Sequence, residues 1–335
     1  IHPGDVLVIP AEYGGWNQLA TLGSHPVADW AERASLMVRD RPTLRLHPDL
    51  LAITPQGRAY LIEHLSDMQT PAKLVQDDGV PRFMTGYLAR QRELYPHTRT
   101  DTKIGGVHVY DYTAKSGISA ANRKRVLINL HGGGFSGCWP GCAELESIPI
   151  ASLAQIRVVS VDYREGPEHK HPAASEDVAA VYRELLKSYR AENIGLYGCS
   201  AGGMLTAMSV AWFQAHGLPR PGAVGIFCAG AGAPKGMSIA DGDAAYTAGP
   251  LGELRVPQAD APAARGGYFA GTDPADPLVA PINSPEVLAK FPPTLLITAT
   301  RGFELSGAVY THTQLVKNAP KTWMDLTKAE YRSEE

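Results

Sequence analysis

Short apolar runs alternate with helix-like repeats between residues 107 and 317. The runs are bounded by turn residues and are apolar along their whole length, as buried parallel strands are. The expected strands are Val107–Tyr110, Val126–Leu130, Ile156–Val161, Ile194–Tyr197, Ala223–Cys228 and Thr294–Thr298. The expected helices are Val178–Tyr189, Met204–Phe213 and Glu304–Lys317. This alternation predicts an α/β fold, with a mostly parallel central sheet flanked by helices.

The first hundred residues do not share this alternation. They are rich in Pro and turn residues, and they have helix-like stretches at Leu50–Leu65 and Phe83–Leu94. We therefore predict an N-terminal extension or cap over residues 1–100 and an α/β core over residues 101–335.

The composition narrows the classes of protein to consider. Of the 335 residues, 44% are hydrophobic and 19% charged, which favours a soluble globular protein over a collagen-like, coiled-coil or disordered one. A net charge of −3 gives no bulk electrostatic reason to bind nucleic acid. No run approaches the ~18 apolar residues of an integral membrane segment. The location stays open: a cytoplasmic protein is weakly favoured, and export is possible if a leader preceded Ile1 and was removed.

The four cysteines are too few for a disulfide scaffold. Cys138 and Cys142 are close enough in sequence to pair or to coordinate a metal. No second pair of Cys or His residues completes a zinc site, which favours two unpaired loop thiols. We expect no metal and no cofactor.

The most informative motif is Gly198-Cys199-Ser200-Ala201-Gly202, a G-x-S-x-G pentapeptide between a predicted strand and a predicted helix. A sharp turn there would force the serine into a strained conformation and project its hydroxyl from the carboxyl edge of the sheet. Glycine is needed two positions away on each side because a Cβ would collide with the adjoining elements. Ser200 is therefore the candidate nucleophile.

A second motif, His131-Gly132-Gly133-Gly134-Phe135, follows the expected strand Val126–Leu130. Consecutive glycines free the backbone to aim N–H groups into a cavity, and acyl transfer needs such donors where the carbonyl oxygen becomes an oxyanion. The candidate oxyanion-hole donors are the amides of Gly132, Gly133 and Ala201.

Together, these motifs resemble the α/β-hydrolase fold and, within it, the bacterial hormone-sensitive-lipase family of carboxylesterases. That family has an acidic residue before the serine, where this chain has Cys199. The stretch Asp162–His169 also resembles a family segment, which implies that Glu168 and His169 hold loops behind the oxyanion hole. The resemblance covers roughly residues 105–317, and it implies that the N-terminal hundred residues supply part of a cap.

The C-terminal end departs from the family pattern. The family's catalytic acid would stand at Gly302, and Glu304 is the candidate substitute. No histidine follows His312, which falls on a predicted helix, so the catalytic histidine is unassigned. The tail from Lys321 is strongly charged, and we predict a truncated or replaced C-terminal end, weak activity, and a homo-oligomer that covers the exposed edge.

Two functions fit these observations. The first, implied by the resemblance, is a serine carboxylesterase that hydrolyses short-chain or small hydrophobic esters through an acyl-enzyme. The alternative is a catalytically impaired homologue that binds a small molecule or a protein partner in the former active-site pocket. The unmatched acid and histidine positions favour the second, and the intact motifs favour the first.

Overall fold

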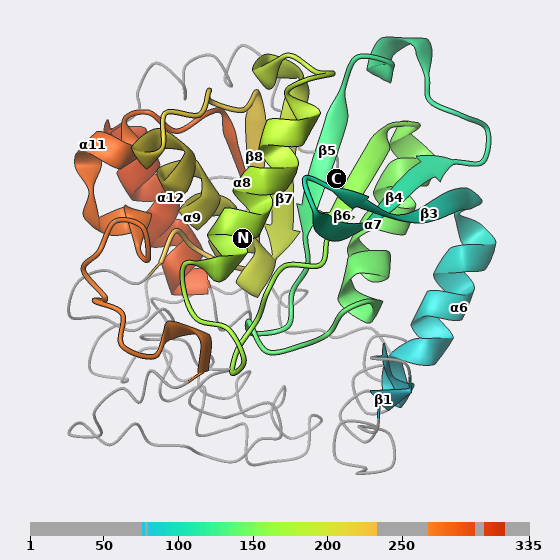
Figure 1. Ribbon diagram of the computed structural model, residues 1–335, viewed down its shortest axis with the longest axis horizontal. Coiled ribbons are helices and arrows are strands. Elements are labelled where there is room, and N and C mark those ends of the chain that lie inside the picture. The colour runs from blue at the N-terminus through green and yellow to red at the C-terminus, as the bar shows by residue number, and fades with distance from the viewer. Residues whose placement is uncertain (1–75, 78–79, 233–266, 299–304, 319–335) are drawn as a thin grey trace, which may run out of the picture. The chain divides into compact units, whose positions relative to one another are not determined.

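A computed structural model describes residues 76–77, 80–232, 267–298 and 305–318 (Figure 1). Its main feature is a seven-stranded sheet in the order β3-β4-β6-β5-β7-β8-β9. The strands are β3 His97–Ile104, β4 Val107–Ala114, β5 Val126–Leu130, β6 Arg157–Val161, β7 Ile194–Cys199, β8 Ala223–Phe227 and β9 Thr294–Ile297. A separate two-stranded ladder pairs β1 Gln76–Asp77 with β2 Val80–Pro81.

The sheet has an antiparallel edge and a parallel centre. β3 and β4 form a hairpin, and β4 runs antiparallel to β6. From β6 to β9 every neighbouring pair is parallel. The carboxyl ends of these five strands therefore meet at one edge, where ligand sites of open α/β sheets form.

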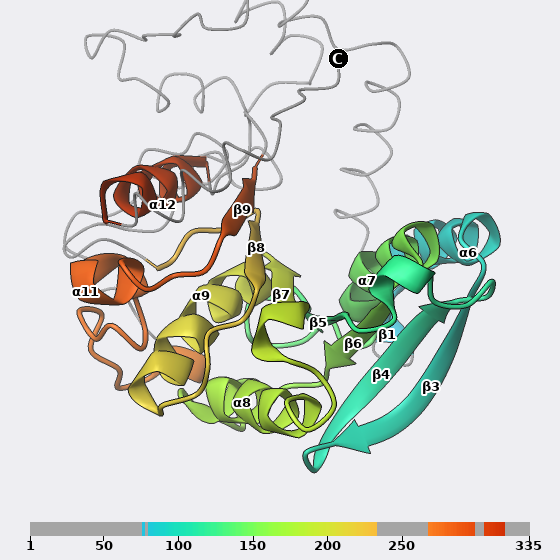
Figure 2. The same cartoon turned by 90° about the horizontal axis from the view of Figure 1, so that it is seen from above.

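Helices cover both faces of the sheet (Figure 2). Helix α7, with α6 beside it, packs on one face, and α8 and α9 pack on the other. The helices are α6 Thr85–Leu94, α7 Gly141–Ala154, α8 Ala173–Leu185, α9 Ala201–Ala215, α11 Pro285–Leu288 and α12 Leu305–Asn318. The 3₁₀ turns are η3 Arg82–Met84, η4 Ala120–Asn122, η5 Ala191–Asn193, η6 Gly267–Phe269 and η7 Pro281–Asn283. None of the helices in the described ranges is long and apolar enough to cross a membrane.

The parallel strands are apolar throughout because both of their faces are covered. Val126, Ile128 and Leu130 of β5 are fully buried in a core shared with α8 and α9. On the other face, Val158 of β6 and Ile148 of α7 belong to a smaller apolar cluster. Burial of each such side chain contributes about 1.5–3 kcal/mol, so the two layers hold the sheet from both sides.

The predicted fold class is confirmed, and each expected strand and helix in the described ranges is present within a few residues. The sequence reasoning missed the polar edge strand β3, helix α7, the short ladder of β1 and β2, and the one-turn helix α11. The helix expected at Leu50–Leu65 lies outside the described residues. The division into residues 1–100 and 101–335 stays a prediction.

Candidate active site

Ser200 lies in the turn between β7 and α9, and its backbone is strained as the motif predicts. Its φ and ψ are 55° and −119°, a region that L-residues rarely adopt. A Cβ on Gly198 would lie 2.2 Å from the carbonyl oxygen of Leu130, and one on Gly202 would lie 1.7 Å from it. Only glycine fits at these two positions, so the turn can pass against the end of β5. The serine itself is partly exposed.

The glycine loop after β5 lies beside this turn. A Cβ built on Gly132 would be 3.6 Å from the Ser200 Cβ. Gly133 has φ +124°, and a Cβ there would lie 1.9 Å from the carbonyl oxygen of Gly137. Gly134 follows with φ +65°. Successive residues of this kind turn their amides toward one side and form anion-binding concavities.

Ala201 is the first residue of α9. The first four N–H groups of a helix have no acceptor within the helix, and the helix dipole concentrates partial positive charge there. The Ala201 amide is therefore an available donor directly after the candidate nucleophile.

The glycine loop is anchored from the segment that follows β6. The Tyr163 hydroxyl donates to the His131 carbonyl oxygen at 2.6 Å, and the two rings stack with centroids 4.4 Å apart. The Gly166 amide donates to the Phe135 carbonyl oxygen at 2.8 Å. These contacts hold the loop at both ends.

The prediction that Glu168 and His169 hold these loops is wrong. Both side chains are exposed. The segment turns at the Gly166–Pro167 peptide, so the residues that reach the glycine loop are those before the turn.

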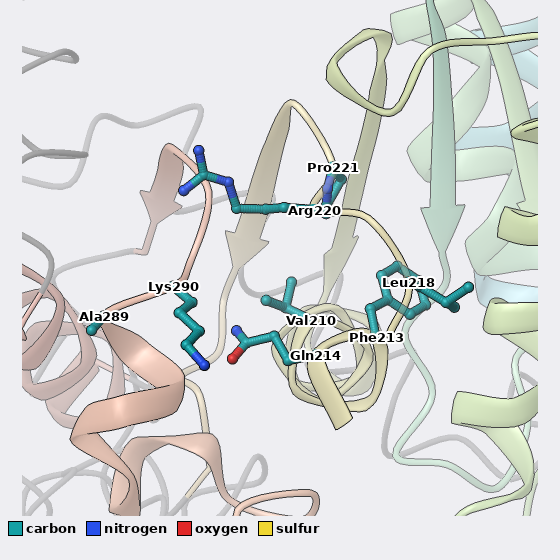
Figure 3. A pocket seen from close by; sticks show the side chains of 8 residues that line it. All are labelled: Val210, Phe213, Gln214, Leu218, Arg220, Pro221, Ala289 and Lys290. Carbon is teal, nitrogen blue, oxygen red and sulfur yellow. The ribbon is translucent and has the colours of Figure 1, made fainter. Parts of the chain in front are cut away.

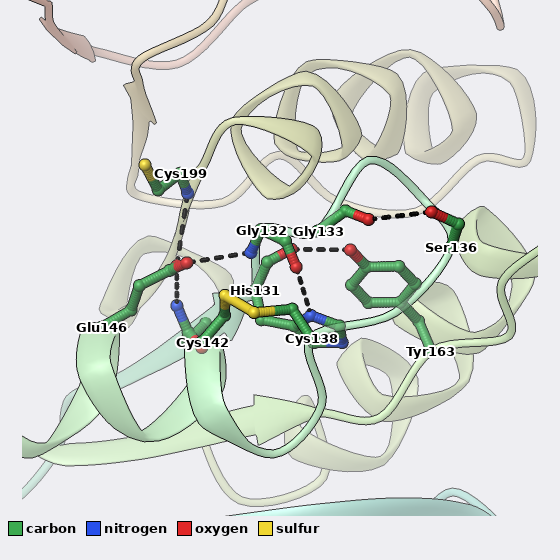
Figure 4. The surroundings of a disulfide bond; sticks show 10 residues. His131, Gly132, Gly133, Ser136, Cys138, Cys142, Glu146, Tyr163 and Cys199 are labelled. Atoms are coloured by element: carbon green, nitrogen blue, oxygen red, sulfur yellow. Dashed lines mark hydrogen bonds between the residues drawn. A yellow bond between two sulfur atoms is a disulfide. The ribbon is translucent and has the colours of Figure 1, made fainter. Parts of the chain in front are cut away.

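Glu146 of α7 was missed by the sequence reasoning. Its Oε1 accepts from the Gly132 amide at 2.9 Å, and its Oε2 accepts from Asn129 Nδ2 at 2.9 Å and from the Cys199 amide at 3.3 Å. Figure 4 shows this carboxylate between the glycine loop and Cys199. The Gly132 amide therefore already has an acceptor, which corrects its assignment as an oxyanion donor.

Comparison with known proteins agrees with this geometry. A family profile described as alpha/beta hydrolase fold matches residues 127–329, more than half of the chain. The chain belongs to this family. Two crystal structures of esterases are similar to this α/β hydrolase. One, from the bacterial hormone-sensitive lipase family, has a TM-score of 0.61 at 25% identity and covers 80% of this chain and 86% of that chain. The other has a TM-score of 0.59 at 29% identity, with coverages of 84% and 88%.

A curated relative, an acetyl-hydrolase of Streptomyces hygroscopicus, is 32% identical over 173 residues. The match covers 51% of this chain and 55% of the relative, so it spans about half the length of that protein. The resemblance to bacterial hormone-sensitive-lipase esterases is confirmed.

Two acidic groups and one imidazole around the glycine loop of this α/β hydrolase have shifted pKa values. Burial raises the pKa of Glu146 to about 7, against the opposing effect of its three hydrogen bonds. Burial likewise raises the pKa of Glu165 to about 7. Burial lowers the pKa of His131 to about 4, so this imidazole is neutral at neutral pH and donates through Nδ1 to the Gly132 carbonyl oxygen at 2.7 Å.

The loop also has a disulfide. Cys138 and Cys142 are bonded, with Cα atoms 5.4 Å apart (Figure 4). This corrects the interpretation of these residues as unpaired thiols, and it also means that they are not metal ligands. Cys142 is the second residue of α7, and the first turn of that helix brings its sulfur back over Cys138. The bond joins the end of the glycine loop to the helix that carries Glu146.

The acid and the base of the site are not among the groups described so far. The Ser200 hydroxyl makes no hydrogen bond within the described ranges. Gly302 and Glu304 lie outside those ranges, and His312 lies on α12, as expected. In the same part of the chain, no three His, Cys, Asp or Glu side chains cluster as metal ligands do.

A pocket of about 350 Å³ lies away from this site (Figure 3). Phe213 and Gln214 near the end of α9 line it, together with Arg220 and Pro221 before β8 and Lys290 after α11. These residues are at the amino edge of the parallel strands, and Ser200 is at their carboxyl edge. The pocket is therefore not the substrate site of the candidate nucleophile.

Proposed function

We propose that this protein is a serine carboxylesterase and that Ser200 is its nucleophile. The observation that carries the proposal is the strained turn at Ser200, with φ 55°, held directly beside a loop of consecutive glycines. A strained serine at the start of a helix costs stability, of order 1–3 kcal/mol. The surrounding close contacts maintain it, as expected of a functional turn.

In the proposed reaction, the Ser200 Oγ bonds to the acyl carbon of the ester, and the carbonyl oxygen becomes an oxyanion. The bond to the alcohol then breaks, and the alcohol leaves with the serine proton. Water attacks the acyl-enzyme, releases the carboxylic acid and returns a proton to Ser200. The group that relays these protons is unassigned.

The proposed oxyanion donors are the amides of Gly133, Gly134 and Ala201. Within the described ranges, the Gly133 and Gly134 amides have no hydrogen-bond acceptor, whereas the Gly132 amide is occupied by Glu146. Gly134 is exposed, and a Cβ there would meet only the Ser136 hydroxyl within 4 Å. The loop thus has room for an oxygen atom beside Gly134.

For the substrate, we propose short-chain esters, acetyl esters among them. The similarity to an acetyl-hydrolase and to two esterases supports this class. Hydrolysis of p-nitrophenyl acetate that disappears in Ser200→Ala is the expected result, and activity should fall along a series of longer acyl chains. Unchanged turnover in Ser200→Ala would contradict the proposal.

The alternative function, a ligand-binding homologue without catalysis, is favoured by one observation, the absence of an imidazole hydrogen-bonded to Ser200 in the described ranges. It predicts no turnover in the wild type. Short esters would then still raise the melting temperature, and Ser200→Ala would leave this shift intact.

We also propose that the protein forms a homo-oligomer through the β9 edge of the sheet. Leu295 and Ile297 of β9 are 57% and 49% exposed, and Val309 and Tyr310 of α12 are 55% and 38% exposed. Exposed strand edges with apolar side chains pair readily with another chain. Sedimentation velocity is expected to show a dimer or larger species that Leu295→Lys dissociates. A monomeric wild type would contradict this assembly.

A further inference from the structure

Glu146 lies where three segments of the active site meet. One carboxyl oxygen accepts from Gly132 in the glycine loop, and the other accepts from Asn129 at the end of β5 and from Cys199 before the nucleophile. Asn129 is fully buried and in turn accepts from the Ser160 hydroxyl at 3.1 Å. Figure 4 shows the carboxylate reaching both sides of the site from α7.

The hydrogen-bond pattern fits the ionised form of the carboxyl. All three partners are N–H donors, and an ionised carboxylate can accept on both oxygens. A protonated carboxyl would place its own O–H against one of these donors. No Lys, Arg or His forms an ion pair with Glu146 within the described ranges, so the amide donors are what stabilise its charge.

The contacts tie together two segments whose relative position matters for acyl transfer. Gly132 leads into the proposed oxyanion donors, and Cys199 directly precedes Ser200. Both are held by one rigid side chain on a helix that is itself fixed to the loop by the Cys138–Cys142 disulfide. An oxyanion donor is effective only at about 2.7–3.1 Å from the reacting oxygen, and a shift of about 1 Å costs about 10²-fold in rate.

We propose that Glu146 is a positioning residue that aligns the glycine loop with the nucleophile turn through the amides of Gly132 and Cys199. It touches neither substrate nor Ser200 Oγ, and it acts through the backbone. This inference rests on the proposed esterase function.

A consequence is that ester hydrolysis should depend on the ionisation of Glu146. Because burial raises its pKa to about 7, a growing fraction is protonated below neutral pH and one backbone contact is lost. The titratable groups that interact with it from the neighbouring segments are Cys199, Cys228, Tyr197 and Tyr163. Burial raises the pKa of both tyrosines, so both stay protonated around neutral pH and neither titrates with Glu146.

The test compares Glu146→Gln with Glu144→Gln. Glu144 is a matched control because it is a buried carboxylate two residues away on the same helix, and its partners are Arg92 and Arg99 rather than the active-site loops. The Gln side chain keeps the shape of Glu146 but has one acceptor oxygen, so at least one backbone amide loses its partner.

For Glu146→Gln we expect a fall in kcat for p-nitrophenyl acetate of about 10²-fold with little change in KM, and the loss of the inflection near pH 7 in log kcat. Glu144→Gln should keep both kcat and the inflection while its melting temperature falls. The rate at which a fluorophosphonate labels Ser200 isolates the first chemical step. We expect this rate to fall in Glu146→Gln and to stay unchanged in Glu144→Gln.

The outcomes distinguish the positioning role of Glu146 from the proposed esterase activity. If Ser200→Ala abolishes turnover but Glu146→Gln keeps the wild-type kcat and pH profile, the positioning role is wrong and the esterase stands. If the wild type neither hydrolyses the ester nor reacts with the phosphonate, both fail. Should Glu146→Gln not fold, Glu146→Asp keeps both acceptor oxygens with a shorter reach and should lower kcat while keeping the inflection. A wild-type kcat in that variant would overturn the proposal.

Discussion

The substitution Gly202→Ala tests how the nucleophile turn is built. A Cβ on Gly202 would lie 1.7 Å from the Leu130 carbonyl oxygen and 2.7 Å from that of His131. Carbon and carbonyl oxygen atoms normally stay about 3.3 Å apart or more, so the start of α9 and the end of β5 must separate by roughly 1.5 Å. The first carries the Ser200 turn and the second leads into the glycine loop.

This displacement has two measurable effects. Overpacking of a tight contact costs about 1–3 kcal/mol of unfolding free energy, and a shift of about 1 Å between reacting groups costs about 10²-fold in kcat. Urea titration gives the first quantity and p-nitrophenyl acetate hydrolysis the second. Gly86→Ala is the control, since Gly86 is helical and a Cβ there meets nothing within 4 Å. It should be neutral or stabilise α6 by up to about 1 kcal/mol. Wild-type stability and turnover in Gly202→Ala would refute the steric explanation.

Three further predictions concern stability. Replacing Cys138 and Cys142 together by Ser should lower the unfolding free energy by about 2 kcal/mol, because the bridge restricts the unfolded chain; an unchanged urea midpoint would contradict this. Arg157→Met should lower the unfolding free energy by about 2 kcal/mol, because it removes the contacts of Nε and Nη2 to Asp111, at 3.1 and 2.7 Å. Urea denaturation measures this loss, and an unchanged unfolding free energy would contradict the prediction. The pKa of Glu146 is 4.5 in the unfolded chain and is raised to about 7 in the folded protein. Its contribution to stability is therefore complete below pH 4.5 and is lost as the pH rises to about 7. The slope of unfolding free energy against pH over that window should therefore become flatter in Glu146→Gln, and an identical slope would exclude the effect.

The fold could be predicted where one sequence pattern determined one element. The strands of the parallel centre are continuous apolar runs, and helix α8 has a single apolar face. Strand β3, His97–Ile104, has mostly polar and exposed residues at the edge of the sheet, so no run marks it. Helix α7 is apolar on several sides because it packs between the sheet and α6, and it therefore lacks the periodic stripe that predicts a helix.

The same distinction holds within the site. Ser200 could be predicted because its turn is determined by glycines within five consecutive residues. The orientation of the Gly132 amide could not, because it depends on a carboxylate that α7 brings from further along the chain. The available signal was Glu146 itself, a charged residue among apolar ones with no cation nearby in sequence. Such a residue needs buried hydrogen-bond donors, and the chain has them at the glycine loop.

Stabilisation of the oxyanion and proton transfer to and from Ser200 depend on different parts of the molecule. The glycine loop, whose amides would donate to the oxyanion, is held by contacts to Tyr163, Gly166 and Glu146 and by the disulfide. None of these contacts involves a proton relay to Ser200. An oxyanion hole with bound substrate retains roughly 10³–10⁴-fold acceleration over water when the triad is incomplete. Loss of the glycine-loop alignment should therefore lower the rate whether or not a histidine acts as the base. Loss of the base alone would leave that alignment, and with it the phosphonate reaction's dependence on Glu146, in place.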